Sequence, residues 1–444
     1  MKAFDFFANY KPLPINPIQM AQNAFVTDSR PEKKGLAQGF LLNDKARQDY
    51  FDIQGNPINT VPGKLFQMAS VKEAKRLAYE ADLNDPNADM YLSPKDQVAS
   101  KLEPLVQKVL FGENSQLIAE NRITTVPFPG MAPTLKAAIT LLATEHPEID
   151  TIVLGTNGYG GYNDVLKPVF KNIVKYTHST NENKFNIENL RETIKNLPDP
   201  RKAVLLIQAD AYNYTGVNPT SDQWKEIVQL IQETEILPLV DNAYHGLMRG
   251  LDEDVEIVRL LAETDSPFIC IDSYSKKAGL YGKRVSFLHI VTGSAEQSTV
   301  LRANLYGHMR TNFIGIPPYF KIVYYLLNDP TLYKIWTEKD LPIARAILTE
   351  TKDQMAEFMG TGFEFISTAN TRGMFNKLNI SAEGNKVLTD KYAIFIVNAK
   401  DEERLDSSGK PSQSQRINMA AIPVDARQYI AQAFREVYEQ YKTD

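Results

Sequence analysis

The sequence is poor in residues that form disulfides and metal sites, and it has no long apolar run. It contains one cysteine, Cys270, and five widely separated histidines without HxxxH or CxxC spacing. We therefore expect no internal disulfide and no metal site, with Cys270 packed in the core. No stretch approaches the ~20 apolar residues of a membrane helix. We expect a cytoplasmic protein with no membrane contact.

A strong excess of charge of either sign is also missing. The 444 residues carry a formal net charge of −5, and 43% are hydrophobic and 23% charged. This balance is typical of a globular protein and gives no reason to expect binding to nucleic acid. The length is too great for one ordinary core, so we expect two or three domains.

Apolar runs and amphipathic segments alternate from about residue 134 to residue 293. Strands are predicted at 151–155, 203–208, 236–240 and 268–271. A fifth strand at 285–291 is expected to be antiparallel or to lie at a sheet edge. The alternation predicts an α/β fold with a mostly parallel sheet covered by helices on both faces. Ligands of such folds bind at the carboxyl ends of the strands.

The chain changes character after residue 332. A long helical stretch at 332–358 is followed by short strand candidates and by a final helix at 423–441. This order predicts a second, smaller α+β domain. The segment 398–414 is polar and charged, and we expect it to form an exposed loop.

The most informative stretch is Ser-Tyr-Ser-Lys-Lys-Ala-Gly-Leu-Tyr-Gly-Lys-Arg, from Ser273 to Arg284. It follows an apolar run that reads as a buried strand. A lysine amine at Lys276 can condense with a carbonyl, and the Arg284 fork can hold a phosphate. Pyridoxal phosphate (PLP) carries both an aldehyde and a phosphate. Taken alone, the segment is also compatible with a solvated basic loop.

This segment resembles the cofactor-lysine motif of class I aminotransferases, the aspartate aminotransferase family of PLP enzymes of fold type I. The resemblance implies that Lys276 holds PLP as an aldimine and that Ser273 and Arg284 contact the cofactor. It also implies an N-terminal arm with part of the small domain at 1–69, a large PLP-binding domain at 70–332 and a small domain at 333–444.

Asp241, in Val-Asp-Asn-Ala-Tyr, follows a predicted strand. An aspartate there can pair with a protonated pyridine nitrogen, and Tyr244 could donate to the cofactor's phenolic oxygen. A helix-capping aspartate followed by a packed tyrosine is the alternative. The family has the same Asp-x-x-Tyr, which implies a catalytic role for Asp241 and cofactor binding by Tyr244.

The family's Asn-Pro-Thr-Gly asparagine, which reaches the same oxygen, has two candidates. Asn218 stands in an Asn-Pro-Thr, but Gln223-Trp224 follows it as in the second x-Pro-Thr of the family. Asn213 is therefore the matching residue. Tyr214 then replaces the family proline, and some local rearrangement is expected.

A Gly-Met-Ala turn that runs into a helix offers backbone N–H groups to an anion, although it could equally be a simple helix start. By resemblance Gly130, Met131 and Ala132 form the phosphate cup. The hydroxyl-bearing cup residue of the family is missing, so either Thr134 compensates or backbone donors suffice.

The resemblance also assigns aromatic and substrate-binding residues. Tyr159 matches an aromatic residue that stacks on the cofactor ring, and Tyr162 replaces the family's histidine. Tyr91 matches a tyrosine that reaches the phosphate of the neighbouring subunit's cofactor. Gly39 lies in a segment that covers the substrate, and Arg416 matches the clamp for the α-carboxylate.

Arg310 precedes an Asn-aromatic pair and a Pro-Pro, as does the family arginine that reaches the partner's site. We expect it to bind the side-chain carboxylate of dicarboxylic substrates. The alternative is an interface or surface residue beside a pocket for neutral or aromatic side chains.

The resemblance implies a PLP-dependent aminotransferase of the aspartate/aromatic type. Its substrates would be an L-amino acid and a 2-oxo acid, and it would form a homodimer with shared active sites. The alternatives are another reaction on the same scaffold, such as a β-lyase or decarboxylase, and an amino-acid sensor that binds PLP without turnover.

Overall fold

The computed structural model describes residues 15–86, 97–312, 319–405 and 411–443, without the side chains of 97–99, 308–312, 404–405 and 411. None of the helices in these ranges is long and apolar enough to cross a membrane.

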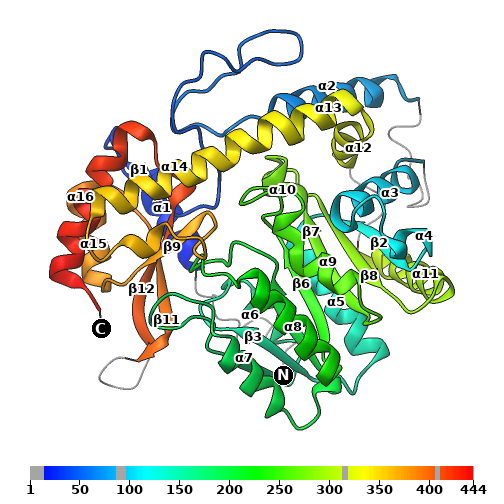
Figure 1. The fold of residues 1–444 in the computed structure, drawn as a ribbon. Helices are drawn as coiled ribbons and strands as arrows, with labels where there is room; N and C mark the ends of the chain where they lie inside the picture. Colours follow the sequence, from blue (N-terminus) through cyan, green and yellow to red (C-terminus); the bar gives the residue numbers. More distant parts are fainter. Residues whose placement is uncertain (1–14, 87–96, 313–318, 406–410, 444) are drawn as a thin grey trace, which may run out of the picture.

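A seven-stranded sheet forms the core of the larger part of the molecule (Figure 1), with the strand order β2-β8-β7-β6-β5-β3-β4. Its strands are β2 (Ile123–Phe128), β3 (Thr151–Gly155), β4 (Asn172–Tyr176), β5 (Ala203–Gln208), β6 (Leu237–Asn242), β7 (Phe268–Ser273) and β8 (Ser286–Val291). Only β8 runs against its neighbours. The predicted α/β class with a mostly parallel sheet is confirmed. The antiparallel strand lies inside the sheet, because β2 occupies the edge.

Helices cover both faces of this sheet, and alternate residues of each strand point to opposite faces. One face packs against α5 (Met131–Glu145), α6 (Tyr162–Leu166) and α11 (Ala295–Asn312). The other packs against α3 (Gln97–Phe111), α4 (Gln116–Ala119), α7 (Ile187–Lys195), α8 (Ser221–Thr234) and α9 (Glu256–Ala262). Cys270 is buried in this second layer, as predicted.

A second region contains a three-stranded antiparallel sheet of β9 (Phe375–Leu378), β11 (Val397–Leu405) and β12 (Pro411–Asn418). Its helices are α14 (Leu341–Met359), α15 (Ala382–Tyr392) and α16 (Val424–Tyr441). A π turn, Trp336–Asp340, joins α14 to α13 (Pro330–Ile335).

The first part of the N-terminal segment packs on this second region, whereas its last helix packs elsewhere. The segment comprises α1 (Pro17–Thr27), β1 (Lys34–Gly35) and α2 (Ala69–Asn84), and α2 packs beside α12 (Phe320–Asn328). β1 pairs in parallel with β10 (Ile394–Phe395). The division into domains at 69/70 and 332/333 stays a prediction.

The expectation of an exposed loop at 398–414 is wrong. The described part of this segment is the hairpin β11–β12, and Asp401, Ser412 and Ser414 are buried in it. Its polar side chains find partners in distant parts of the chain, so polarity did not mean exposure.

Candidate functional site

The candidate residues gather at the carboxyl edge of the seven-stranded sheet. Asp241 belongs to β6, and Lys276 lies in α10 (Tyr274–Lys277), directly after β7. Gly130 caps α5 soon after β2, and Tyr159 follows β3. Arg284 precedes β8, whose antiparallel direction brings its first residue to this edge. This is the edge at which α/β sheets bind ligands.

Two adjacent lysines, Lys276 and Lys277, have different surroundings. The Lys277 amine is fully buried, donates to both oxygens of Asp272 at 2.7 Å and lies 3.1 Å from His245 Nδ1. The Lys276 amine lies 5.2 Å from the centre of the Tyr244 ring, and no residue that the structure describes hydrogen-bonds it. Of the two amines, only that of Lys276 is available to a ligand.

Burial and two nearby arginines favour the neutral amine of Lys276. Burial lowers the pKa of Lys276, Asp241 opposes this shift, and the Arg284 and Arg416 charges lower the pKa further. A neutral amine is the form that attacks a carbonyl.

Asp241 presents one free carboxylate oxygen to the site. Oδ2 accepts a hydrogen bond of 2.5 Å from the Tyr162 hydroxyl, whereas Oδ1 is buried with no partner among the described residues. Burial raises the pKa of Asp241 to about 6, and the Tyr162 bond and the Lys276 charge oppose this. A protonated ring nitrogen would satisfy Oδ1 and restore the ionised form. The position of Tyr162, at the family's histidine, was predicted from the sequence, but its contact with Asp241 was not.

The turn at Gly130 is shaped to receive an anion. Gly130 has a φ of 99°, and a Cβ there would lie 3.3 Å from Arg284 Nε. The N-terminus of α5 and the Arg284 fork therefore approach the same point, as phosphate binding requires. The Thr134 hydroxyl donates to Gly130 O at 2.8 Å, so it serves the helix's own first turn. Met131 and Ala132 are the first residues of α5 and bring their backbone N–H groups to this turn.

Ser273 lies at the end of β7, beside the lysine. It is buried, and its hydroxyl accepts from Ser275 N at 3.2 Å, which caps α10. The contact of Ser273 with the cofactor stays a prediction.

Asn213 and Tyr244 lie together beside Asp241. Asn213 N donates to Gln208 Oε1 at 2.9 Å, and Asn213 Oδ1 is buried with no partner within the described ranges. Burial raises the pKa of the Tyr244 phenol, and the Arg416 charge opposes this. The peptide bond between Asn213 and Tyr214 is cis.

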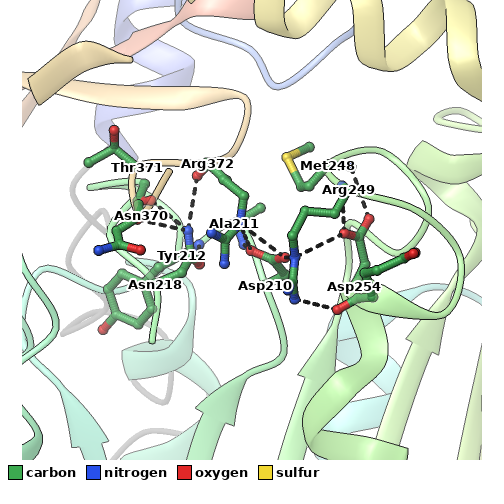
Figure 2. Close-up of polar contacts among 12 residues, drawn as sticks. Asp210, Ala211, Tyr212, Asn218, Met248, Arg249, Asp254, Asn370, Thr371 and Arg372 are labelled. Carbon is green, nitrogen blue, oxygen red and sulfur yellow. Dashed lines mark hydrogen bonds and ion pairs between the residues drawn. The ribbon is translucent and has the colours of Figure 1, made fainter. Parts of the chain in front are cut away.

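Asn218, the other candidate asparagine, is used inside its own loop (Figure 2). Its Oδ1 accepts from Tyr212 N at 3.0 Å, its Nδ2 donates to Gly216 O at 2.6 Å, and its backbone N donates to Asn370 O at 2.8 Å. These bonds tie the loop after β5 to the second region, and they support Asn213 as the ligand-facing residue.

The same loop is held by ion pairs at its start. Asp210 lies between Arg249 and Arg372, with Nε–O distances of 3.3 and 3.2 Å. Arg249 also reaches Asp254 (Figure 2). The two carboxylates of this cluster are buried and its arginines partly exposed, and the ion pairs hold the backbone that leads to Asn213.

Arg416, on β12, is a buried cation without a carboxylate partner in the described ranges. Its Nη2 donates to Ala37 O at 2.7 Å, its guanidinium lies 4.5 Å from the centre of the Phe375 ring, and its buried Nε has no partner there. A Cβ on Gly39 would lie 2.8 Å from Phe375 Cζ, so only glycine fits. A buried, unpaired arginine favours binding of an anion.

Two predicted residues fall outside what the structure describes. Tyr91 lies in the segment 87–96, which is outside the described residues. The backbone of Arg310 belongs to α11, but its side chain is also outside them. Tyr159 is 37% exposed and contacts Tyr162 edge-on, with ring centres 5.4 Å apart. It remains open to a flat ligand.

Sequence similarity points to one family. Residues 63–434 match the family described as aminotransferase class I and II. The aspartate aminotransferase of Pseudomonas aeruginosa is 26% identical over 88% of this chain and 93% of its own length. The aromatic-amino-acid aminotransferase of Escherichia coli is 25% identical over 86% of this chain and 91% of its own length.

Solved structures share the fold over the whole chain. An aromatic-amino-acid aminotransferase from Burkholderia pseudomallei, covalently bound to pyridoxal phosphate, has a TM-score of 0.82 at 24% identity and covers 97% of this chain and 99% of that one. The aspartate aminotransferase of Saccharomyces cerevisiae cytoplasm also has a TM-score of 0.82 at 24% identity, covering 99% and 100%. The predicted fold type and the family resemblance are both confirmed.

Proposed function

The chain belongs to the class I and II aminotransferases, and on that premise we propose that Lys276 is the residue that binds its cofactor, pyridoxal phosphate. The enzyme transfers an amino group from an amino acid to a 2-oxo acid. The observation that carries the assignment is the contrast between the two lysines: Lys277 is bound to Asp272, whereas Lys276 faces the polar groups of the site.

The unpaired polar atoms of the site fit this cofactor. When bound, the cofactor supplies an electron sink for the charge that develops at the substrate's Cα. Asp241 Oδ1 would accept the proton of the ring nitrogen, and Asn213 and Tyr244 would bind the phenolic oxygen. Gly130, the start of α5 and Arg284 would hold the phosphate. Support comes from the oxygens of Asp241 and Asn213 that have no partner in the described parts of the chain, and from the close approach of Arg284 to Gly130.

The chain's own groups also bind the substrate and move its proton. Arg416 pairs with the α-carboxylate, which fixes the Cα–H bond relative to Lys276. The Lys276 amine, whose pKa is lowered, would remove the proton from the substrate's Cα and return a proton to C4′ of the cofactor. Tyr159 would cover the cofactor ring, and Gly39 would leave room for the substrate beside Phe375.

We propose an aspartate, glutamate or aromatic amino acid as the amino donor, because similar proteins carry the names aspartate and aromatic-amino-acid aminotransferase. Arg310 of the partner subunit would bind a distal carboxylate, and Tyr91 would reach the partner's cofactor phosphate. This part of the proposal includes a homodimer and a cytoplasmic location. Light scattering of the purified protein tests the dimer.

The lysine assignment is tested by borohydride reduction of the holoenzyme followed by peptide mapping. We expect the pyridoxyl label on Lys276, and a label on Lys277 would overturn the assignment. Half-reactions with each of the twenty amino acids, followed by the cofactor's absorbance, identify the donor. Conversion of the cofactor to its amine form by none of them would overturn the proposed donors.

A further inference from the structure

The hairpin β11–β12 reaches from the three-stranded sheet to the part of the seven-stranded sheet that carries β3 and β4 (Figure 1). Consecutive acidic residues of β11 make the contact. Asp401 accepts a hydrogen bond from Asn157. Glu402 accepts from Asn157 and from Lys175. Glu403 accepts from Thr156 and from Ser179. All of these partners lie in the turns after β3 and β4 or in β4 itself.

Asn157 uses both its backbone and its side chain in this contact. Its Nδ2 donates to Asp401 Oδ1 at 2.7 Å, and its Oδ1 accepts from Glu402 N at 2.7 Å. Its backbone N donates to Glu402 Oε2 at 3.2 Å. The side chain is buried, and the φ of 53° lies in the left-handed region, which asparagine adopts more readily than most residues. The hairpin therefore fixes both the position and the orientation of Asn157.

The turn at 156–158 is also joined to the loop that carries the cofactor-site asparagine. Tyr214 N donates to Asn157 O at 3.3 Å, and the Tyr212 hydroxyl donates to Thr156 O at 2.9 Å. Tyr159, the proposed ring-stacking residue, follows Asn157 by two positions. One turn thus connects the hairpin with two sides of the proposed cofactor site.

A lysine neutralises the buried carboxylate of the contact. Asp401 is fully buried, and Lys377 Nζ on β9 lies 3.2 Å from Asp401 Oδ2. The same amine lies 3.8 Å from Glu403 Oε2. Buried charges persist when they are paired and hydrogen-bonded. Asp401 is therefore held in the orientation that accepts from Asn157.

We propose that Asn157 is a positioning residue of the transamination reaction, through which the hairpin β11–β12 holds Tyr159 and Asn213 in place around the cofactor. This inference rests on the proposed function, which puts both residues against the cofactor. Asn157 itself touches neither cofactor nor substrate: it transmits the hairpin's geometry to the two residues that do.

The test compares glycine variants at two asparagines with the same backbone conformation. Asn157→Gly removes the side-chain bonds to Asp401 and Glu402 without straining a left-handed residue. Asn183→Gly is the matched control, because Asn183 has a φ of 57° and its side chain hydrogen-bonds none of the residues described. The readouts are the affinity of each apoenzyme for pyridoxal phosphate, the pH midpoint of the holoenzyme's absorbance, and separate values of kcat and KM.

For Asn157→Gly we expect cofactor binding and kcat to weaken about 10- to 100-fold, the scale of a small misplacement of site residues, together with a shifted absorbance midpoint. Asn183→Gly should match the wild type. A purely structural role for Asn157 would lower the melting temperature alone. Affinity and absorbance within twofold of the control would overturn the proposal.

An exchange of the two partners sharpens the test. Asn157→Asp places two carboxylates against each other and should be as impaired as the glycine variant. Adding Asp401→Asn restores one amide and one carboxylate, and it should recover part of the cofactor affinity, because Glu403 N, which donates to Asp401 Oδ1 at 3.1 Å, loses its acceptor. An exchange variant as impaired as Asn157→Asp would overturn the pairing. The pyridoxyl label on Lys276 is measured separately in the wild-type holoenzyme. A failure of the proposed function can therefore be distinguished from a failure of this inference.

Discussion

Removing Lys277 should destabilise the fold far more than its place beside the proposed cofactor lysine suggests. The Lys277→Met change leaves Asp272, which is fully buried, with the Asn242 amide at 2.9 Å but without the cation that it contacts through both oxygens. Breaking a buried pair by removing one partner costs roughly 3–5 kcal/mol, whereas exposed pairs contribute about 0–1 kcal/mol. We therefore expect a loss of about 3–5 kcal/mol in the free energy of unfolding.

The sign of the pH dependence follows from Asp272. Burial alone would raise the pKa of this carboxyl, but the Lys277 charge holds it below the usual value. The wild-type pair therefore contributes stability above the carboxyl's unfolded pKa of about 4. In Lys277→Met no lysine charge opposes the effect of burial, so the pKa of Asp272 in the folded protein rises above its unfolded value. The variant then loses stability as the pH increases through that raised pKa. The difference in the free energy of unfolding between wild type and variant should be larger at pH 8 than at pH 5.

Urea unfolding followed by circular dichroism at both pH values measures this difference in the free energy of unfolding. Lys225→Met is the control, because Lys225 and Asp222 form an exposed pair on α8, and its loss should stay below about 1 kcal/mol. The double variant Lys277→Met, Asp272→Asn should recover a large part of the loss. A loss below about 1 kcal/mol for Lys277→Met, or a double variant that simply adds the two single losses, would refute the reasoning.

Four changes in the site test individual roles. Asp241→Ala should bind the cofactor yet turn over ~10²-fold or more slowly, and near-normal single-turnover rates would contradict this. Tyr162→Phe removes a hydrogen bond that lowers the pKa of Asp241, so the acid limb of kcat/KM should move to higher pH; an unchanged profile would argue against the contact. Arg416→Ala should cost roughly 2–5 kcal/mol in kcat/KM for every amino donor. Arg310→Ala should cost a similar amount for aspartate but much less for phenylalanine, and equal losses would exclude the distal clamp.

The central strands could be predicted because they are buried on both faces. The apolar runs at 151–155 and 203–208 coincide with β3 and β5, residue for residue. β2 was missed because Pro127 lies inside it, and proline argues against a strand unless that strand lies at an edge, as β2 does. β4, the opposite edge strand, mixes polar and apolar residues without clear alternation.

The site residues are a different case, because a motif gives positions rather than contacts. Lys276, Asp241 and Arg284 were predicted from motifs that resemble those of the family, and the structure brings them to one edge of the sheet. The burial of Asp401 could not be predicted, because its partners Asn157 and Lys377 lie far away in the sequence. Polar segments that are buried by distant polar partners look like surface loops until the fold is known.

The pairing of β1 with β10 has a consequence for synthesis on the ribosome. Lys34 and Gly35 emerge early, but their partners Ile394 and Phe395 follow only after the whole seven-stranded sheet has been made. At 5–20 residues per second, the first strand waits about 20–70 s for its partner. The central sheet can form during that interval, while the region that holds Arg416 can close only on the finished chain. Any truncation before residue 395 should therefore leave the N-terminal segment without its strand partner, exposed to chaperones and proteases.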